Sequence, residues 1–267
     1  MNRRNFLKAA SKTAAGILLS GNISNAANNE KEIDDLEKYD FIFPRVKFTP
    51  LKVPGRGQAP DKWNVRPGGE RNLLRRLSTV IRCKTKPILY VNEFDGFEPS
   101  LGKDNQFNDI VTFDDRDKII KYPFLFMTGE NEFRFTQNQK DNLKEYINRG
   151  GFLFMEDCVI DRGGDLFYKS AFDLLENVFG RNSVLKVPKS HEIFHNVFDL
   201  SDIELPYMQG QPYGARGIFI NNRLAIFLSS HDIHCGWCDN NCTNFGPVKY
   251  EQAIQMGINI IMYSITH

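Results

Sequence analysis

The sequence has almost no surplus of charge of either sign. Its 267 residues hold 34 Lys and Arg against 33 Asp and Glu, which leaves a formal net charge of +1. A protein that binds nucleic acid usually gathers a basic surplus on one face, so this balance argues against nucleic acid as a partner. Internal repeats and long low-complexity segments are absent too, and the length is sufficient for one sizeable core or two small ones.

Long apolar runs are also lacking. The apolar stretch near the N-terminus is interrupted by Lys12 and falls short of the ~20 residues that a membrane-spanning helix needs. No later run reaches that length either. We therefore expect no transmembrane segment in the mature chain.

The first 27 residues have instead the composition of a removable export signal. Arg3 and Arg4 precede Phe6-Leu7-Lys8, a short apolar stretch and small residues at 24–27. The paired arginines resemble the twin-arginine motif, which the twin-arginine export machinery recognises on folded cargo. The alternative is an ordinary amphipathic helix with two solvated arginines. Removal of residues 1–27 takes away four basic and no acidic residues, so the charge changes from +1 to −3. We expect a periplasmic or otherwise exported protein.

After a polar linker at 28–38, residues 39–267 have the pattern of a single α/β domain. Continuous apolar runs at 123–127, 152–155 and 184–187 alternate with amphipathic helical segments. Such alternation is typical of a mostly parallel sheet that is covered by helices on both faces. The other predicted elements are helices at 70–82, 137–149, 166–179 and 253–265, strands at 39–49 and 88–91, an irregular connection at 54–69, and a late β-hairpin at 217–228 that turns at Asn221-Asn222.

The carboxyl ends of the predicted strands carry polar side chains, and ligands of open parallel sheets bind at that edge. If the strands are neighbours, two or three carboxylates, a thiol and an imidazole share one rim, where they can bind a metal or transfer protons. The alternative is that these carboxylates cap helix N-termini and interact with solvent. The candidate catalytic residues are Glu130, Asp157, Cys158, His231 and Asp232.

Cys158 follows a predicted strand, where a thiol near a helix N-terminus has a lowered pKa and can act as a nucleophile. The strained turn of a nucleophile elbow requires small neighbouring residues, whereas Cys158 lies between Asp157 and Val159. This pattern favours a buried thiol over a catalytic one.

A denser group of metal-binding residue types follows at 231–242. Its cysteines have CxxC and CxxxC spacing, and sulfur and imidazole ligands suit a transition metal such as zinc. There is no second CxxC pair, and in an oxidising compartment two of these cysteines can instead form a disulfide. The candidate ligands are His231, His234, Cys235, Cys238 and Cys242.

A literal HExxH match runs from His191 to His195 and, on an α-helix, would place both imidazoles on one face as in zinc proteases. Pro188 directly upstream and the apolar Ile193-Phe194 pair argue against a long helix here.

Several segments together resemble the family of the domain of unknown function 4159. They are 66–77, 122–129, 150–153, 191–194 and 256–267, and the likeness extends over roughly residues 40–267. The resemblance implies a class I glutamine amidotransferase-like (flavodoxin-like) α/β fold, often in exported or membrane-attached proteins, and no established activity. The region after Asp232 departs from the family pattern, so the resemblance assigns no role to the cysteines there.

The sequence therefore predicts an exported, soluble α/β domain that binds a ligand, a metal or an envelope partner at the strand-end rim. One alternative is a periplasmic hydrolase or metal-dependent enzyme that uses Asp157, Cys158, His231 and Asp232. A second alternative is a structural component of an envelope complex.

Overall fold

The computed structural model describes residues 38–51, 63–65, 68–88, 109–159, 165–203 and 205–267. The predicted export signal, almost all of the linker, most of the 54–69 connection and nearly all of the predicted strand at 88–91 lie outside these residues. Among the helices of the described part, none has the length and apolar character required to cross a membrane.

A seven-stranded mixed sheet forms the centre of the domain, with the strand order β2-β1-β3-β4-β7-β6-β5. Five neighbouring strands, β2, β1, β3, β4 and β7, are parallel, whereas β6 and β5 are antiparallel at one end. The strands are β1 (Pro44–Val46), β2 (Asp109–Val111), β3 (Phe124–Gly129), β4 (Phe152–Asp157), β5 (Leu185–Lys186), β6 (Arg216–Ile220) and β7 (Arg223–Ser229). The predicted α/β architecture with a mostly parallel sheet and a late hairpin is confirmed.

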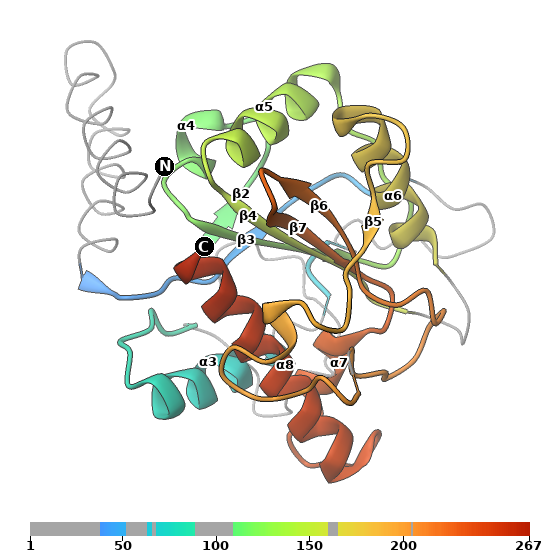
Figure 1. The fold of residues 1–267 in the computed structure, drawn as a ribbon. Coiled ribbons are helices and arrows are strands. Elements are labelled where there is room, and N and C mark those ends of the chain that lie inside the picture. The colour runs from blue at the N-terminus through green and yellow to red at the C-terminus, as the bar shows by residue number, and fades with distance from the viewer. Residues whose placement is uncertain (1–37, 52–62, 66–67, 89–108, 160–164, 204) are drawn as a thin grey trace.

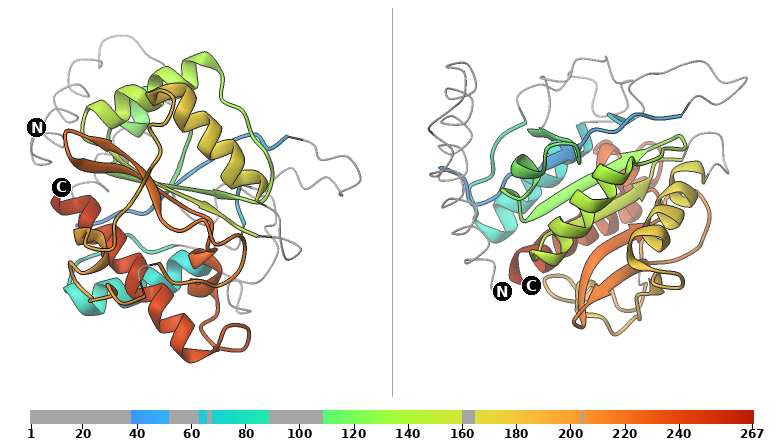
Figure 2. Two further views of the ribbon diagram at one scale, coloured as in Figure 1. Left: turned by 45° about the vertical axis from the view of Figure 1, so that its right-hand side comes forward. Right: turned by 90° about the horizontal axis from the view of Figure 1, so that it is seen from above.

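Helices cover both faces of this sheet (Figures 1 and 2). On one side lie α4, α5 and α6, and on the other side lie α3, α7 and α8. The helices are α3 (Gly68–Ile81), α4 (Arg116–Ile119), α5 (Gln137–Asn148), α6 (Leu166–Phe179), the 3-10 turn η1 (Glu192–Phe194), α7 (Ile233–Cys238) and α8 (Gly246–Thr266).

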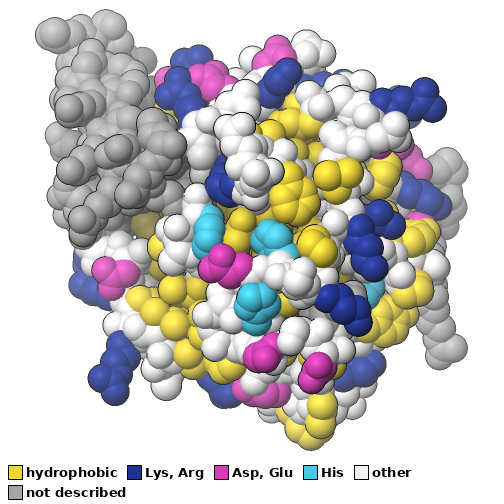
Figure 3. Space-filling view, viewed as in Figure 1, with side chains coloured by type: hydrophobic (Ala, Val, Ile, Leu, Met, Phe, Trp, Pro, Cys, Tyr) yellow, Lys and Arg dark blue, Asp and Glu magenta, His cyan; other side chains and the backbone are white. Residues whose placement is uncertain are grey.

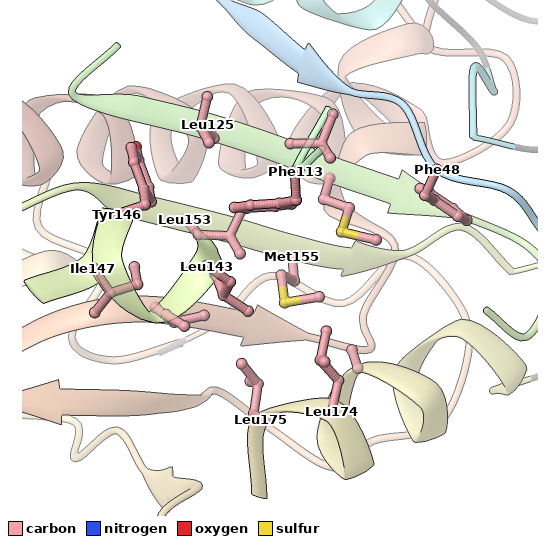
Figure 4. Packing of buried hydrophobic residues seen from close by; sticks show 14 of the residues in the cluster. Phe48, Phe113, Leu125, Leu143, Tyr146, Ile147, Leu153, Met155, Leu174 and Leu175 are labelled. Carbon is pink, nitrogen blue, oxygen red and sulfur yellow. The ribbon is translucent and has the colours of Figure 1, made fainter. Parts of the chain in front are cut away.

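The continuous apolar strands supply two separate cores, because successive side chains of a strand point to opposite faces. Leu125 and Leu153 pack under α5 and α6, together with the residues shown in Figure 4. Phe126 and Phe154 point the other way, towards Trp237 of α7. This two-sided burial explains why β3 and β4 are apolar without alternation.

Local signals in the sequence account for several element boundaries. Thr136 caps α5 through a reciprocal capping box with Gln139, and Gly180 ends α6 with φ of 108°. Asn221 and Asn222 both have positive φ, 51° and 64°, which the tight turn between β6 and β7 requires.

Other expectations need correction. The 184–187 run forms only the short edge strand β5, which is antiparallel to β6. The HExxH segment is the single 3-10 turn η1, so no α-helix presents both histidines on one face. The C-terminal helix begins at Gly246 instead of 253, because Pro247 supports a helix start there although the first turns are polar. The short elements β2, α4 and α7 were not predicted.

Candidate functional site

The carboxyl ends of β3, β4 and β7 lie side by side, so the condition for a shared polar rim is met. Thr128 pairs with Glu156, Gly129 with Asp157, and Glu156 with Ser229. The three polar strand ends therefore form one rim, to which the segment leading into α7 is attached (Figure 2).

Asp157 points from this rim towards α6. Its carboxylate accepts a hydrogen bond from the Tyr168 backbone N–H at 3.0 Å. Burial raises the pKa of Asp157 to about 8, against the effect of that hydrogen bond, and the carboxylates of Asp232, Asp165 and Glu130 contribute to the rise. The position of Asp157 corresponds to the helix-capping alternative that the sequence left open.

Glu156 points to the opposite face, towards α7. Its carboxylate accepts hydrogen bonds from the backbone N–H groups of Ile233 and His234 at 2.8 and 2.9 Å and from the Ser229 hydroxyl at 2.7 Å. Burial raises the pKa of Glu156 to about 8, and the nearby Asp232 carboxylate adds to this effect. Glu156 thus anchors the first turn of α7 to the end of β4.

Beside Glu156, three buried side chains form the group that we call the thiol–carboxylate site: Cys158, Asp232 and Cys235. The two sulfurs and one carboxylate oxygen lie within 4.8 Å of one another. The Sγ atoms of Cys158 and Cys235 are 3.7 Å apart, although 77 positions separate them in the chain. Val65 belongs to the same buried apolar cluster as the two cysteines.

Asp232 has the most unusual conformation in this site. Its backbone lies in the left-handed region, with φ of 55° and ψ of 43°. Oδ2 accepts hydrogen bonds from the Val159 N–H at 3.2 Å and from Gln209 Nε2 at 2.6 Å. Oδ1 is buried and has no hydrogen-bond partner among the residues described. Burial raises the pKa of Asp232 above its ordinary value, against the effect of hydrogen bonds from Gln209 and from the Cys235 thiol. A buried carboxylate oxygen without a nitrogen or oxygen donor is a feature that calls for an explanation such as a role in ion binding.

The separation of the two sulfurs is that of a thiol–thiol hydrogen bond and also fits two ligands of a tetrahedral ion. Two thiolates bound at ~2.3 Å to a tetrahedral zinc are about 3.8 Å apart, and the observed Sγ–Sγ separation is 3.7 Å. A disulfide would require about 2.05 Å. All five cysteines of the chain lie in described ranges, and all five are thiols.

The five ligands predicted from the sequence do not come together; only Cys235 belongs to the site found among the described residues. His231 holds a loop, because its Nε2 accepts the Gly214 N–H at 3.3 Å. Cys238 packs so closely on α3 that a Cβ at Gly69 would lie 2.9 Å from its Sγ.

His234 and Cys242 also lie apart from the thiol–carboxylate site. The His234 imidazole turns towards Glu70, at 3.3 Å. Cys242 is half-buried in the turn after α7, with φ of 58°.

The two partners of Cys235 are residues that the sequence predicts to have a different role. Cys158 and Asp232 were proposed as catalytic residues at strand ends, whereas Cys235 was assigned to the cysteine-rich segment. The adjacency of β4 and β7 brings the two sets together.

The remaining histidines are His191, His195 and His267. Histidine side chains gather on the surface of the face seen in Figure 3. His267 stacks on Tyr263 with ring centroids 4.3 Å apart and pairs with Glu192 at 3.1 Å. His191 lies 5.2 Å from the same tyrosine ring. These contacts pack η1 against α8.

Comparison with protein-family models matches residues 56–265 to the model described as "Domain of unknown function (DUF4159)". The match confirms the family resemblance seen in the sequence. The same chain has no match among curated proteins.

Proposed function

This chain belongs to the DUF4159 family, and we propose that this member is a metal-binding domain of the cell envelope. The proposed ion is zinc, or another divalent ion that prefers thiolates, bound between Cys158, Asp232 and Cys235. The observation that carries the proposal is the convergence of two thiols and one carboxylate, all buried, from two separate segments of the chain.

Two further features support this function. Asp232 has a left-handed backbone conformation, which is uncommon for non-glycine residues although Asp and Asn adopt it more readily than the others. Oδ1 of this residue is buried and unsatisfied by the N–H groups that bind Oδ2, and the Cys235 thiol is hydrogen-bonded to the same carboxylate. A bound cation would take the place of that thiol proton. Thiolates with one carboxylate are a ligand set that zinc accepts.

Metal analysis of the full chain, isolated from the cytoplasm and from the periplasm, tests the proposal. We expect one ion per chain, lost in Cys158→Ser and in Cys235→Ser. The matched controls are Cys83→Ser and Cys242→Ser, because both cysteines are half-buried and lie outside the site. A thiol count that shows a Cys158–Cys235 bridge, with no metal in either compartment, would refute the metal function and favour a structural role.

Export through the twin-arginine machinery is the second part of the proposal. Its support is the paired Arg3-Arg4 before an apolar stretch. We expect Arg3→Lys/Arg4→Lys to keep the protein in the cytoplasm, as seen by cell fractionation, whereas Lys8→Arg should leave export intact. Accumulation of the double variant in the periplasm would contradict export by the twin-arginine machinery. An envelope protein as partner is a proposal that depends on it.

An enzymatic role is compatible with the proposed metal site and is the alternative function. Three protein ligands leave a fourth tetrahedral position, as in catalytic zinc sites, where the ion lowers the pKa of a bound water. Asp157 and His231 instead make contacts to α6 and to a loop. Cys158 is not among the non-glycine residues with positive φ in the described chain. This backbone conformation argues against a strained nucleophile elbow at Cys158 and against amidotransferase catalysis.

The class I glutamine amidotransferase-like fold is proposed from the family resemblance.

A further inference from the structure

A fully buried network of three charged or titratable side chains lies beside the thiol–carboxylate site. Arg45 on β1, Glu70 on α3 and His234 on α7 each have an exposed fraction of 0%. Arg45 Nη2 forms an ion pair with Glu70 Oε1 and lies 3.1 Å from His234 Nε2. The same imidazole nitrogen is 3.3 Å from Glu70 Oε2. The network therefore joins a strand and two helices that are distant in the sequence.

This network reaches the thiol–carboxylate site from two directions. His234 directly precedes Cys235 on α7, so the orientation of its ring is coupled to the rotation of that helix. On the other side, Arg45 Nη1 donates to the Val65 carbonyl at 2.7 Å. Arg45 and Glu70 thus contact His234 on the helix that carries one sulfur, and Arg45 also holds Val65, which belongs to one buried cluster with both cysteines.

Stability alone does not explain these buried charges. The Arg45 guanidinium lies 5.5 Å from the centre of the Phe126 ring, and the His234 ring packs 5.4 Å from both Phe126 and Trp237. Removing charges from water into such apolar surroundings is costly, and replacement of a buried ionic group by apolar side chains of similar volume is often neutral or stabilising. What such a network does supply is one fixed geometry, because hydrogen bonds are directional and apolar contacts are not.

We infer that Arg45, Glu70 and His234 are positioning residues, which set the rotation of α7 so that Cys235 faces Cys158 at metal-binding distance. The role of this positioning, to build a metal site, rests on the proposed metal function. The placement of the two sulfurs can nevertheless be measured without a metal. Positioning groups outside the ligand set commonly change metal affinity by 10–100-fold.

The test compares two variants of the full chain in a Co²⁺ titration followed by the thiolate-to-cobalt absorption. The first variant, Arg45→Met/Glu70→Leu/His234→Phe, replaces the network by apolar side chains. The matched control is Arg76→Met/Glu251→Leu, which removes an ion pair between α3 and α8 whose partners are 44% and 37% exposed. We expect the network variant to keep its urea midpoint and to bind Co²⁺ about 10–100-fold more weakly, with the control unchanged. A folded network variant with wild-type affinity and absorption would overturn the inference.

A second measurement needs no metal. Diamide accepts two electrons and two protons from a pair of thiols, which become one disulfide while diamide is reduced to the hydrazine. We expect the rate of Cys158–Cys235 closure, measured by mass spectrometry of peptides, to fall several-fold in the network variant. A rate of disulfide closure equal to that of the wild type overturns the inference. This outcome is decisive even if the wild type binds no Co²⁺, a result that would refute the metal proposal alone.

If the apolar variant does not fold, Glu70→Gln replaces it in both measurements, because glutamine keeps the shape and an acceptor oxygen. Folded Glu70→Gln protein with unchanged Co²⁺ affinity and an unchanged closure rate would likewise overturn the inference.

Discussion

The substitution Asp232→Asn separates ligand chemistry from folding at the thiol–carboxylate site. Both of the hydrogen bonds from Val159 and Gln209 end on the same oxygen, Oδ2. An asparagine carbonyl in that place keeps both bonds, and its amide then replaces only Oδ1, which receives no N–H hydrogen bond in the described structure. The hydrogen bond between the Cys235 thiol and the carboxylate is the one contact that the change can alter. Asparagine also tolerates the left-handed backbone at this position. The change therefore removes an anionic metal ligand at little cost to the fold.

The expected effect can be worked out from linkage. With free zinc at 100 times the wild-type Kd, binding stabilises the native state by about 2.7 kcal/mol. Loss of a group outside the ligand set weakens metal binding by up to about 100-fold. If loss of the carboxylate has an effect of that size, the same zinc concentration stabilises the native state by only about 0.4 kcal/mol. Because 1 kcal/mol corresponds to roughly 2–4 °C in Tm for a domain of this size, the zinc-dependent rise in Tm should shrink by about 5–9 °C.

Thermal unfolding with chelator and with buffered zinc measures this difference. Without zinc, Asp232→Asn should unfold within about 1 kcal/mol of the wild type, since a buried carboxylate near Glu156 is replaced by a neutral group. Asp117→Asn on the exposed start of α4 is the matched control and should keep the full zinc response. An equal zinc-dependent shift in Asp232→Asn and wild type would refute the assignment of Asp232 as a ligand.

Two further predictions concern stability. Burial raises the pKa of Asp239, but hydrogen bonds from the Phe245 and Asn244 N–H groups outweigh this effect and lower the pKa overall. Its contribution is therefore complete above the ordinary Asp pKa of ~3.9 and is lost as the pH falls through the lower folded-state pKa. Asp239→Asn should lower the free energy of unfolding, measured in urea, by about 1–3 kcal/mol at pH 7 and by less at pH 3. The same loss at both pH values would contradict this explanation. Gly217→Ala should lower the free energy of unfolding by about 1–3 kcal/mol, because the new Cβ would overlap the Ile226 carbonyl oxygen on the paired strand. A urea midpoint equal to that of the wild type would show instead that β6 can move away from β7.

The main fold could be predicted from the sequence because its strongest signals are local. Residues 137–149 carry helical spacing, a capping threonine and a glycine stop, and the structure has α5 there. The apolar runs at 123–127 and 152–155 are too uniform for a sheet exposed to water on one face, and both form buried central strands. The elements that were missed, β2, α4 and α7, have three, four and six residues. Elements that short carry too few residues for a periodic pattern to emerge.

By itself the sequence determined an α/β domain with buried parallel strands, and it placed polar groups at the strand ends, because residue spacing along a strand or helix decides which face is apolar. Only the tertiary structure decided which polar groups meet. Spacing along the chain suggested that Cys235, Cys238 and Cys242 act together. The structure instead turns Cys238 towards Gly69 on α3 and brings Cys158 within 3.7 Å of Cys235. The physical reason is that β4 and β7 pair in register, and this pairing places residues 77 positions apart at one edge of the sheet.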